Sequence, residues 1–397
     1  MQSVKALDEL TLADLWQVVP HDEEFWEDTK PRLQTMLKHL MQGALEEELV
    51  TLLRAGKYRR VEWRRGYRNG FYERDLVTQI GIVQGVRVPR ARGLPADHAV
   101  FERYQRRQAE VNQLIRDVFL RGVSTREVGR VLETMLGERV SAATVSRVAR
   151  SLDAEVQRFH RQPLTDAWRY LLLDGVYLRV KAAPKVRRRL VLCAFAIGLD
   201  GRRRLLGFRI ADSESEACWS AFLSDLQARG LGGQHLKLVV TDGCAGLHAA
   251  LQAVYPYVPR QHCWAHKLRN VSNLLKRGHQ AACIAGARRI YQAATRRAAV
   301  AAYWDWARRW RPQAPRAVAC LERDLEDLLA HLACPPHDRR AVRTTNAIER
   351  CFREVRRRTR PMSCFTNDAS CERIIYAVVS HLNQSWEARP AQSTQKA

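Results

Sequence analysis

Three acidic residues, Asp174, Asp242 and Glu349, stand where carboxylates could do chemistry. Asp174 lies inside the apolar stretch YLLLDGVYL, and Asp242 directly follows the apolar stretch LVVT. A lone charge in such a strand costs several kcal/mol unless it is paired or binds a metal ion. Two carboxylates at strand positions suit hard cations that prefer oxygen ligands, above all Mg²⁺.

Together, the three carboxylates would form a two-metal site for phosphodiester chemistry. In such a site the ions lie about 3.5–4 Å apart and clamp the attacking and leaving oxygens. One ion lowers the pKa of a water or a 3′-hydroxyl, the other stabilises the leaving oxygen, and no covalent enzyme intermediate is needed. The expected cofactor is therefore a pair of Mg²⁺ ions, with Mn²⁺ as a substitute.

Each of these residues also has an ordinary structural interpretation. A glycine follows both aspartates directly, so either one alone could be a turn or N-cap residue. Asn346 and Glu349 have the spacing of a capping box, so the glutamate could cap its own helix. Glu354 competes with Glu349 for a catalytic role, and the two point to different helix faces because they are five residues apart.

A Cys-x-x-His unit, Cys263 to His266, follows a predicted strand. A structural zinc ion would need two more soft ligands. His262, Cys244 and Cys283 are available, but they form no second matching pair. The preferred interpretation is a local Cys–His hydrogen bond that shapes the site, together with Asn346.

The elements that must position these residues follow a recognisable order. Residues 169–181, 187–201 and 202–212 have strand patterns, with an Asp200-Gly201 turn between the second and third. A helix over 214–229, a strand ending at Asp242 and another helix come next. This order predicts an α/β layer with an acid at the C-terminal end of a buried strand. Residues 264–340 lack strand patterns and predict a helical insertion, and helices are expected over 344–359 and 369–385.

The charge of the chain favours a polyanionic partner. The 397 residues carry a formal net charge of +24, and the pI is about 10.2. Residues 54–107 hold 14 bases and 5 acids, and residues 341–360 hold 7 arginines and 2 glutamates. Nucleic acid is the first candidate partner. A membrane is not expected because no apolar run approaches the roughly 20 residues that a span needs.

The location in the cell is predicted from cysteines and the N-terminus. The ten cysteines are scattered singly, and the first residues lack a basic head followed by an apolar core. Scattered cysteines without a secretion signal indicate reduced thiols. We therefore expect a cytoplasmic protein.

The N-terminal part predicts DNA-binding elements. Residues 32–54 form an amphipathic helical pattern, and 59–92 predict a small basic β-rich element. Ser124 or Thr125 can cap a helix that Gly137 ends, and Ser141 can cap a second helix. This arrangement is typical of a helix-turn-helix, although two ordinary packed helices would give the same pattern. The second helix carries the expected base- and phosphate-contacting residues Thr144, Ser146, Arg147 and Arg150.

Taken in order, these motifs make the sequence resemble the mutator-type bacterial insertion-sequence transposases over roughly residues 30–385. The resemblance is carried by LLLDGVYLRVK, VVTDGCAGLHAAL, QHCWAHKLRNV and RTTNAIERCFREVRRRTRPMSCFTNDASCERII. YRNGFYERDLVTQIGIVQGVRVPRARG and ESEACWSAFLSDLQARGL match less strongly. One departure is Cys351-Phe352, where relatives often have leucine and asparagine, which puts in doubt a polar DNA contact from residue 352.

The resemblance implies a DDE triad at Asp174, Asp242 and Glu349 on an RNase H-like core, with Mg²⁺ as cofactor. It also implies terminal inverted repeats as substrate and a homodimer or larger multimer acting on paired DNA ends in the bacterial cytoplasm, at the nucleoid. Arg356, Arg357 and Arg358 would hold the DNA backbone near the site. A catalytically inactive DNA-binding regulator and a simple nuclease of the same core are the alternatives.

The expected fold class is an α/β RNase H-like core, a mixed sheet flanked by helices, preceded by DNA-binding domains. Its expected parts are an N-terminal helical region (1–58), a basic β-rich element (59–95), a helix-turn-helix domain (96–162), a first core part (163–263), an all-helical insertion (264–340), a second core part (341–388) and a disordered tail (389–397).

Overall fold

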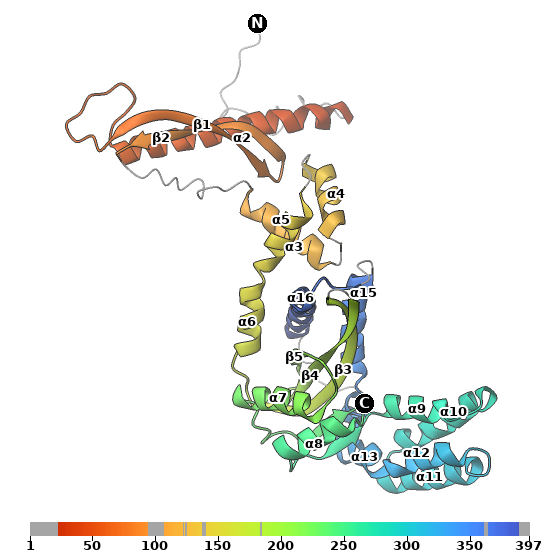
Figure 1. Cartoon of the computed structure of the whole chain (residues 1–397). Coiled ribbons are helices and arrows are strands. Elements are labelled where there is room, and N and C mark those ends of the chain that lie inside the picture. The colour runs from red at the N-terminus through yellow and green to blue at the C-terminus, as the bar shows by residue number, and fades with distance from the viewer. Residues whose placement is uncertain are drawn as a thin grey trace, which may run out of the picture. The chain divides into compact units, whose positions relative to one another are not determined.

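The computed structural model describes residues 23–93, 107–121, 123, 125–136, 140–182, 185–360 and 364–388. The chain divides into two compact units, Met1–Phe119 with Val123–Ala149 and Leu120–Gly122 with Arg150–Ala397. Figure 1 labels the elements of each unit. The expected tail at 389–397 and two expected helix-end residues, Ser124 and Gly137, lie outside the described residues.

The first unit begins with a helix packed on a β-hairpin. Helix α2 (Glu23–Leu53) contains the predicted amphipathic stretch, and strands β1 (Tyr67–Thr78) and β2 (Gly81–Arg92) pair antiparallel in the predicted β-rich element. Leu45 of α2 packs with Leu76, Val83, Val86 and Val88 of the hairpin. These apolar side chains fix one face of the hairpin against α2 and leave its other face exposed.

Three short helices complete the first unit: α3 (Ala109–Leu120), α4 (Thr125–Leu136) and α5 (Ala142–Arg150). The hydroxyl of Ser141 accepts a hydrogen bond of 3.2 Å from the backbone N–H of Thr144, as expected for the cap of α5. Val145 and Ala149 are the buried side of α5. Residues 144, 146, 147 and 150 therefore lie away from its most buried positions.

The second unit contains a five-stranded mixed sheet in the order β5-β4-β3-β6-β7. Strands β3 (Trp168–Ala182), β4 (Lys185–Gly198) and β5 (Arg203–Ala211) are antiparallel neighbours. Strands β6 (Leu238–Thr241) and β7 (Arg260–His262) run parallel to β3. Asp200 and Gly201 form the predicted turn, and Gly201 has a φ of +78°. The mixed sheet between helices is the expected α/β arrangement.

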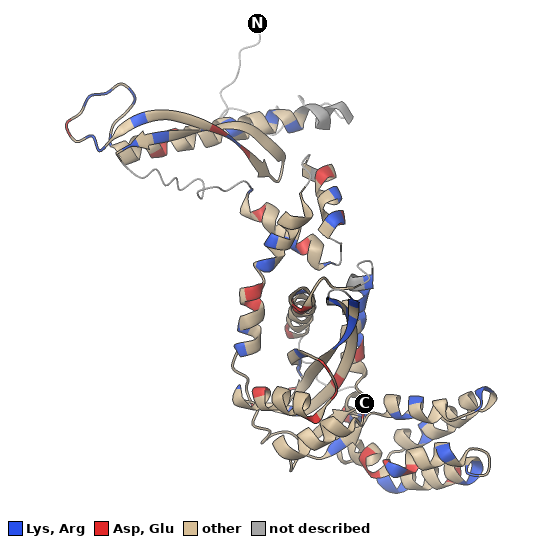
Figure 2. Ribbon diagram, in the orientation of Figure 1, with Lys and Arg blue, Asp and Glu red and all other residues tan. Residues whose placement is uncertain are grey.

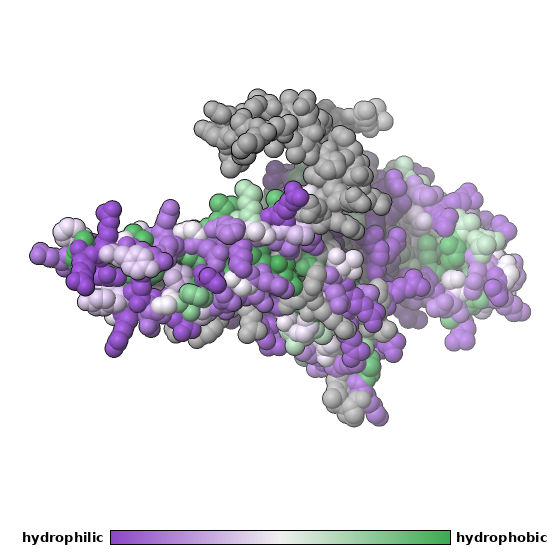
Figure 3. All heavy atoms as spheres, turned by 90° about the horizontal axis from the view of Figure 1, so that it is seen from above, coloured by the Kyte–Doolittle hydropathy of each residue, from purple (hydrophilic) through white to green (hydrophobic). Residues whose placement is uncertain are grey.

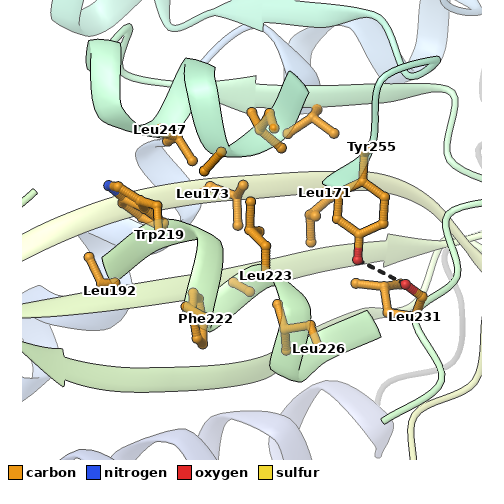
Figure 4. Close-up of a cluster of buried hydrophobic side chains, with 14 of the residues drawn as sticks. Leu171, Leu173, Leu192, Trp219, Phe222, Leu223, Leu226, Leu231, Leu247 and Tyr255 are labelled. Atoms are coloured by element: carbon orange, nitrogen blue, oxygen red, sulfur yellow. Dashed lines mark hydrogen bonds between the residues drawn. The ribbon is translucent and has the colours of Figure 1, made fainter. Parts of the chain in front are cut away.

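Helices cover both faces of this sheet. On one face, Trp219, Phe222 and Leu223 of α7 (Glu216–Ala228) and Leu247 of α8 (Ala245–Val254) pack on strand residues such as Leu171 (Figure 4). Three more helices contact the strands. Helices α6 (Asp153–Arg161) and α16 (Asp368–Glu387) contact β5, and α15 (Asn346–Thr359) contacts β3 and β4. Because strand side chains alternate, residues flanking Leu171 and Leu173 point away from the α7–α8 layer.

The residues expected to form a helical insertion fold into their own apolar cluster. They comprise α9 (Trp264–Asn273), α10 (Arg277–Gln292), α11 (Arg296–Trp310), α12 (Pro315–Arg323), α13 (Leu325–Leu329), η2 (Ala330–Ala333) and α14 (Pro336–Val342). Trp306 is buried there and donates a 3.0 Å hydrogen bond to the carbonyl of Cys283. In the described part of the chain, no helix is long and apolar enough to cross a membrane.

Candidate active site

Asp174 lies in the middle of β3 and is only 4% exposed. Strand pairing continues through Gly175, which is opposite Leu192, so the turn interpretation of Asp174 is wrong. Leu171 and Leu173 point into the core beneath α7 and α8, and Asp174 therefore points to the opposite face of the sheet. The carboxylate of Asp174 therefore lies in a buried strand, on the side where α15 contacts the sheet.

Asp242 directly follows β6, the parallel neighbour of β3. Leu172 and Val240 form the last pair of the two strands, so Asp174 and Asp242 each lie two residues beyond it, at the same end of the ladder. Neighbouring strands lie about 4.8 Å apart, which brings the two acidic residues into one locality. Asp242 Oδ1 also accepts a 3.0 Å hydrogen bond from the N–H of Cys244, so part of its turn interpretation is correct.

Glu349 enters from the first turn of α15. The N-cap of this helix is Thr345, without a side-chain capping bond, so the capping box predicted as an alternative does not form. Instead, Glu349 Oε1 lies 3.4 Å from a guanidinium nitrogen of Arg269 and 3.9 Å from Nε2 of His266. Glu354 instead forms a 2.8 Å ion pair with Arg357.

The carboxyl group of Asp174 is influenced electrostatically by its neighbours. Burial raises the pKa of Asp174 from 3.8 to about 6, and the negative charges of Asp242 and Glu349 add to this effect. The charge of His266 and a hydrogen bond from Thr345 act in the opposite direction. The site therefore gathers negative charge on a buried group that would be stabilised by an added cation.

Cys263, His266 and Thr345 form a hydrogen-bonded cluster beside these carboxylates. Thr345 donates its backbone N–H to Cys263 Sγ at 3.2 Å and its hydroxyl to the same sulfur at 3.5 Å. The hydroxyl also lies 3.5 Å from Nδ1 of His266. Thr345 is buried and immediately precedes α15, so the cluster links the start of α9 to the helix that carries Glu349. Sequence analysis missed Thr345.

This cluster also sets the charge of the imidazole. Hydrogen bonding to Cys263 raises the pKa of His266 to about 9, against the opposing effect of burial. Burial opposes ionisation of Cys263, but hydrogen bonds from His266 and Thr345 lower the pKa of its thiol. The imidazole is consequently a positive group that faces Glu349. Cys263 is engaged with Thr345 and His266, as the hydrogen-bond interpretation of the Cys-x-x-His unit expects.

Glu214 is a fourth acidic residue that sequence analysis missed. It lies in the loop between β5 and α7, and a β-carbon on Gly175 would be only 2.6 Å from its Oε1. Its carboxylate thus lies against β3 at Gly175, on the face opposite to the one to which Asp174 points. Burial and the charge of Asp242 raise the pKa of Glu214, and His266 lowers it. The nearby Asp212 and Glu216 made this residue indistinguishable from surface acids in the sequence.

A cavity of about 370 Å³ opens over these residues. Asp174, His266 and Glu349 line it, whereas Asp242 does not. Its other charged lining residues are four arginines, Arg188, Arg269, Arg353 and Arg356. Figure 2 shows basic residues gathered on α15 and on the adjoining ends of β3 and β4. The cavity therefore combines a carboxylate floor with cationic walls, which suits a phosphodiester approached by metal ions.

The carboxylate oxygens of these residues suit a divalent cation, but their side chains are not arranged to coordinate one. Among the residues that the structure describes, no group of three or more Asp, Glu, His or Cys side chains is arranged to hold an ion. The carboxylate oxygens nevertheless match the preference of Mg²⁺ for oxygen donors. Ion binding by these residues would require their side chains to move closer together.

The expected DNA-contacting residues lie in two parts of the chain. Thr144, Ser146 and Arg147 belong to α5, where Arg147 is exposed and the hydroxyl of Thr144 lies 3.0 Å from that of Ser141. Arg150 ends the same helix. Arg356 and Arg357 are exposed on α15, whereas the side chain of Arg358 lies outside the described part.

The β1–β2 hairpin carries exposed aromatic side chains with arginines near their rings, which sequence analysis did not single out. Figure 3 shows the largely hydrophilic surface of the first unit. Three guanidinium groups lie 4.7–5.1 Å from ring centroids, in the pairs Arg64–Tyr67, Arg87–Phe71 and Arg90–Tyr72. Such a surface of cations and π-faces is suited to contacts with nucleic acid.

Comparisons with known proteins agree with these features. Residues 13–389 match the family model described as "Transposase, Mutator family". The chain is 34% identical over 354 residues to the transposase for insertion sequence element ISRM5 of Rhizobium meliloti, covering 89% of this chain and 88% of the relative. It is 35% identical over 353 residues to the transposase for element IS406 of Burkholderia multivorans, with coverages of 88% and 90%. A transposase for element IS256 in transposon Tn4001 of Staphylococcus aureus is 31% identical over 364 residues, with 90% of both chains covered.

Proposed function

Because the chain belongs to the Mutator family of transposases, we propose that it binds the terminal inverted repeats of its insertion sequence and catalyses metal-dependent DNA strand cleavage and strand transfer. The observation that carries the proposal is the β3–β6 register, whose last pair lies two residues before both Asp174 and Asp242. It is supported by the pKa of Asp174, which is raised by burial and further by the charge of Asp242. The cavity that Asp174 shares with Glu349 is walled by arginines. Neither feature is needed by a protein that only binds DNA.

Asp174, Asp242 and Glu349 are the residues proposed to hold two Mg²⁺ ions, with Mn²⁺ as a substitute. When bound, the ions would supply Lewis acidity for an attacking water or 3′-hydroxyl and for the leaving oxygen. Arg269 and Arg353 would neutralise phosphate oxygens that enter the cavity. Because all these groups belong to the second unit, one site could serve both cleavage and strand transfer.

Cys263, His266 and Thr345 are proposed to position Glu349 rather than to touch DNA. Support comes from the bonds of Thr345 to Cys263 Sγ and from the 3.9 Å approach of His266 to Glu349. Asn346 begins α15, and its carbonyl accepts a 3.4 Å hydrogen bond from Arg350. The cluster would hold the first turn of α15 against the start of α9, so that Glu349 keeps its place when DNA enters.

The first unit is proposed to recognise the DNA ends. Helices α4 and α5 would form a helix-turn-helix, with Thr144, Ser146 and Arg147 reading bases and Arg150 contacting phosphate. The β1–β2 hairpin would add phosphate contacts. The mixed sheet is proposed to be an RNase H-like core, and the chain to act as a homodimer or larger multimer on paired ends.

Cleavage of an end-containing duplex in Mg²⁺ tests the proposal. Asp174→Asn, Asp242→Asn and Glu349→Gln should each lose strand cleavage by at least about 1000-fold, as expected when a group that acts in the transition state is removed. Binding of the same duplex, measured by gel shift in EDTA, should change by less than about threefold. Glu354→Gln is the matched control and should cleave normally.

The alternatives predict different products. A DNA-binding regulator would shift the duplex without nicking it in any metal. A simple nuclease would nick it but never join the freed 3′ end to a target. Activity of Glu349→Gln together with loss of activity in Glu354→Gln would show that the wrong glutamate has been assigned.

A further inference from the structure

A second cavity of about 570 Å³ adjoins the candidate active site. Tyr177, Arg353 and Arg356 line both cavities, so the two adjoin. Strand β3 passes from one to the other, with Asp174 in the first and Leu178 in the second. A DNA strand that enters the candidate active site would therefore continue past this second cavity.

The floor of the second cavity is apolar and rigidly built. The segment at Phe365 pairs with β3 through a 2.9 Å bond from its N–H to the carbonyl of Arg179 and a 2.8 Å bond from the N–H of Lys181 to its own carbonyl. Phe365 is 2% exposed and Leu178 is 5% exposed. The floor is thus fixed by strand pairing, and Leu178 and Phe365 contribute apolar lining to the cavity.

The rim is cationic and is held by helix packing. Arg353, Arg356, Arg357 and Arg360 follow one another at helical spacing and line the cavity. The other side of α15 buries Cys351, Phe352 and Val355 in the protein. Arg179 of β3 completes the rim, and the residues that line this cavity in the described part of the chain include no carboxylate. Glu354 neutralises part of this charge through its 2.8 Å ion pair with Arg357, and the other arginines of the rim favour an anionic occupant.

Tyr177 stands between the two cavities. Tyr177 is 41% exposed, although Val176 and Leu178 beside it in the strand are buried. Among the described strands, β3 pairs here with β4 alone, because its pairing with β6 ends at Leu172. The guanidinium of Arg188 lies 4.8 Å from its ring centroid. This contact holds the ring of Tyr177, which lines both cavities where they adjoin.

We propose that this second cavity binds one unpaired nucleotide of the DNA strand, adjacent to the phosphodiester cleaved in the first cavity. Its phosphates would contact the arginine rim, and its base would contact Leu178, Phe365 and Tyr177. Charge and shape select this occupant. A paired duplex offers phosphates but keeps its bases stacked, whereas an extruded nucleotide offers both an anion and an apolar face. The inference rests on the proposed function.

Fluorescence of 2-aminopurine tests the inference without relying on cleavage. The base analogue is placed in turn at each position flanking the cleavage point, and the duplex is bound by the full chain carrying Glu349→Gln in EDTA. One position should brighten severalfold on binding because its base leaves the stack. Tyr177→Ala should reduce this signal, and Tyr257→Ala, a tyrosine 96% exposed elsewhere, should not. No brightening at any position overturns the proposal.

Affinity for abasic DNA provides the second measurement. Tyr177→Ala should weaken binding of the normal duplex by about 5- to 150-fold, the range for one lost base stack. With an abasic nucleotide at the responsive position, the variant and the parent protein should bind equally. An equal loss on both DNAs would mean that Tyr177 acts only through folding, and it refutes a base contact.

The rim is tested through salt dependence. Arg360→Gln should reduce the slope of log affinity against log salt by about 1, as expected for one lost phosphate contact. Arg308→Gln, an exposed arginine of α11, is the control and should leave the slope unchanged. These readouts concern binding alone. Brightening without cleavage by the unsubstituted chain would therefore refute the proposed function but support the nucleotide site. Cleavage without brightening would support the proposed function and refute the nucleotide site.

Discussion

Replacing Asp174 by asparagine is expected to stabilise the metal-free protein while it abolishes activity. Asp174 is 4% exposed, and Asp242 and Glu349 place further negative charge nearby. Asparagine has nearly the same volume, so it removes the charge without leaving a cavity. The ionised carboxylate is unfavourable in these surroundings, and the neutral amide relieves that cost.

The magnitude follows from the pKa of this carboxyl. Burial raises the pKa from 3.8 to about 6. At about 1.36 kcal/mol per pH unit, the difference corresponds to about 3 kcal/mol of lost stability when the group is ionised. A domain of this size gains about 2–4 °C per kcal/mol. Since the buried amide offsets part of the gain, an increase of about 5 °C in the unfolding midpoint is expected.

The sign depends on pH. The folded-state pKa of Asp174 lies above its unfolded value. The contribution of this carboxyl group to stability is therefore fully present below about pH 4 and is lost progressively up to about pH 6. Thermal unfolding in EDTA should therefore show the gain of Asp174→Asn at about pH 7.5 and almost none at about pH 4. Mg²⁺ should raise the midpoint of the wild-type chain and not that of the variant.

Exposed Asp305 provides the control, because Asp305→Asn removes one negative charge at a solvated position of α11. It should leave the midpoint unchanged at both pH values. The reasoning is refuted if Asp174→Asn unfolds at or below the wild-type temperature in EDTA near neutral pH. A gain of equal size at low pH would also refute it, since the charge would then not be the cause.

Three further substitutions test other parts of the second unit. Thr345→Val removes the hydroxyl that bonds to the sulfur of the Cys-x-x-His unit; it should slow strand cleavage about tenfold with little change in the unfolding midpoint, and Thr345→Ser should restore the rate. Asn383→Leu removes two hydrogen bonds, of 2.9 and 3.1 Å, to the backbone of Leu205; it should cost about 2–4 kcal/mol in urea denaturation because two buried groups lose their partners. Asp324→Ala leaves the buried ammonium of Lys267 without its partner carboxylate; a loss of about 3 kcal/mol is expected, measured in the same way.

The strand elements were predictable because their apolar patterns are strong. Asp174 and Asp242 could be singled out from sequence, since charges inside or directly after buried strands are rare. The register that brings them to the same end of the β3–β6 ladder could not be predicted, because it depends on how α7 and its loops return the chain to β6. Periodicity identifies a strand, but it does not say which residues of two distant strands are paired.

Residues whose roles depend on distant loops could not be found from sequence. Thr345 stands before a helix, where threonine is an ordinary cap, and only the structure brings it to the sulfur of Cys263. Glu214 lies among other acids, and only the approach of its loop to Gly175 distinguishes it. The choice between Glu349 and Glu354 likewise depends on which side of α15 faces the cavity.

The position of Glu349 does not depend on the far end of the helical insertion that precedes it in the chain. The N–H of Trp264, the first residue of α9, donates a 3.0 Å hydrogen bond to the carbonyl of Arg343, just after α14. The chain that leaves the sheet at Cys263 therefore returns to the same place before α15 begins, where Thr345 bonds to the sulfur. Because the two ends of the insertion are held together, its length or position can change while the residues at these ends stay in place. We therefore expect the Cys-x-x-His unit to act structurally, by holding the base of the insertion against the residues that precede α15, although it lies at the edge of the candidate active site.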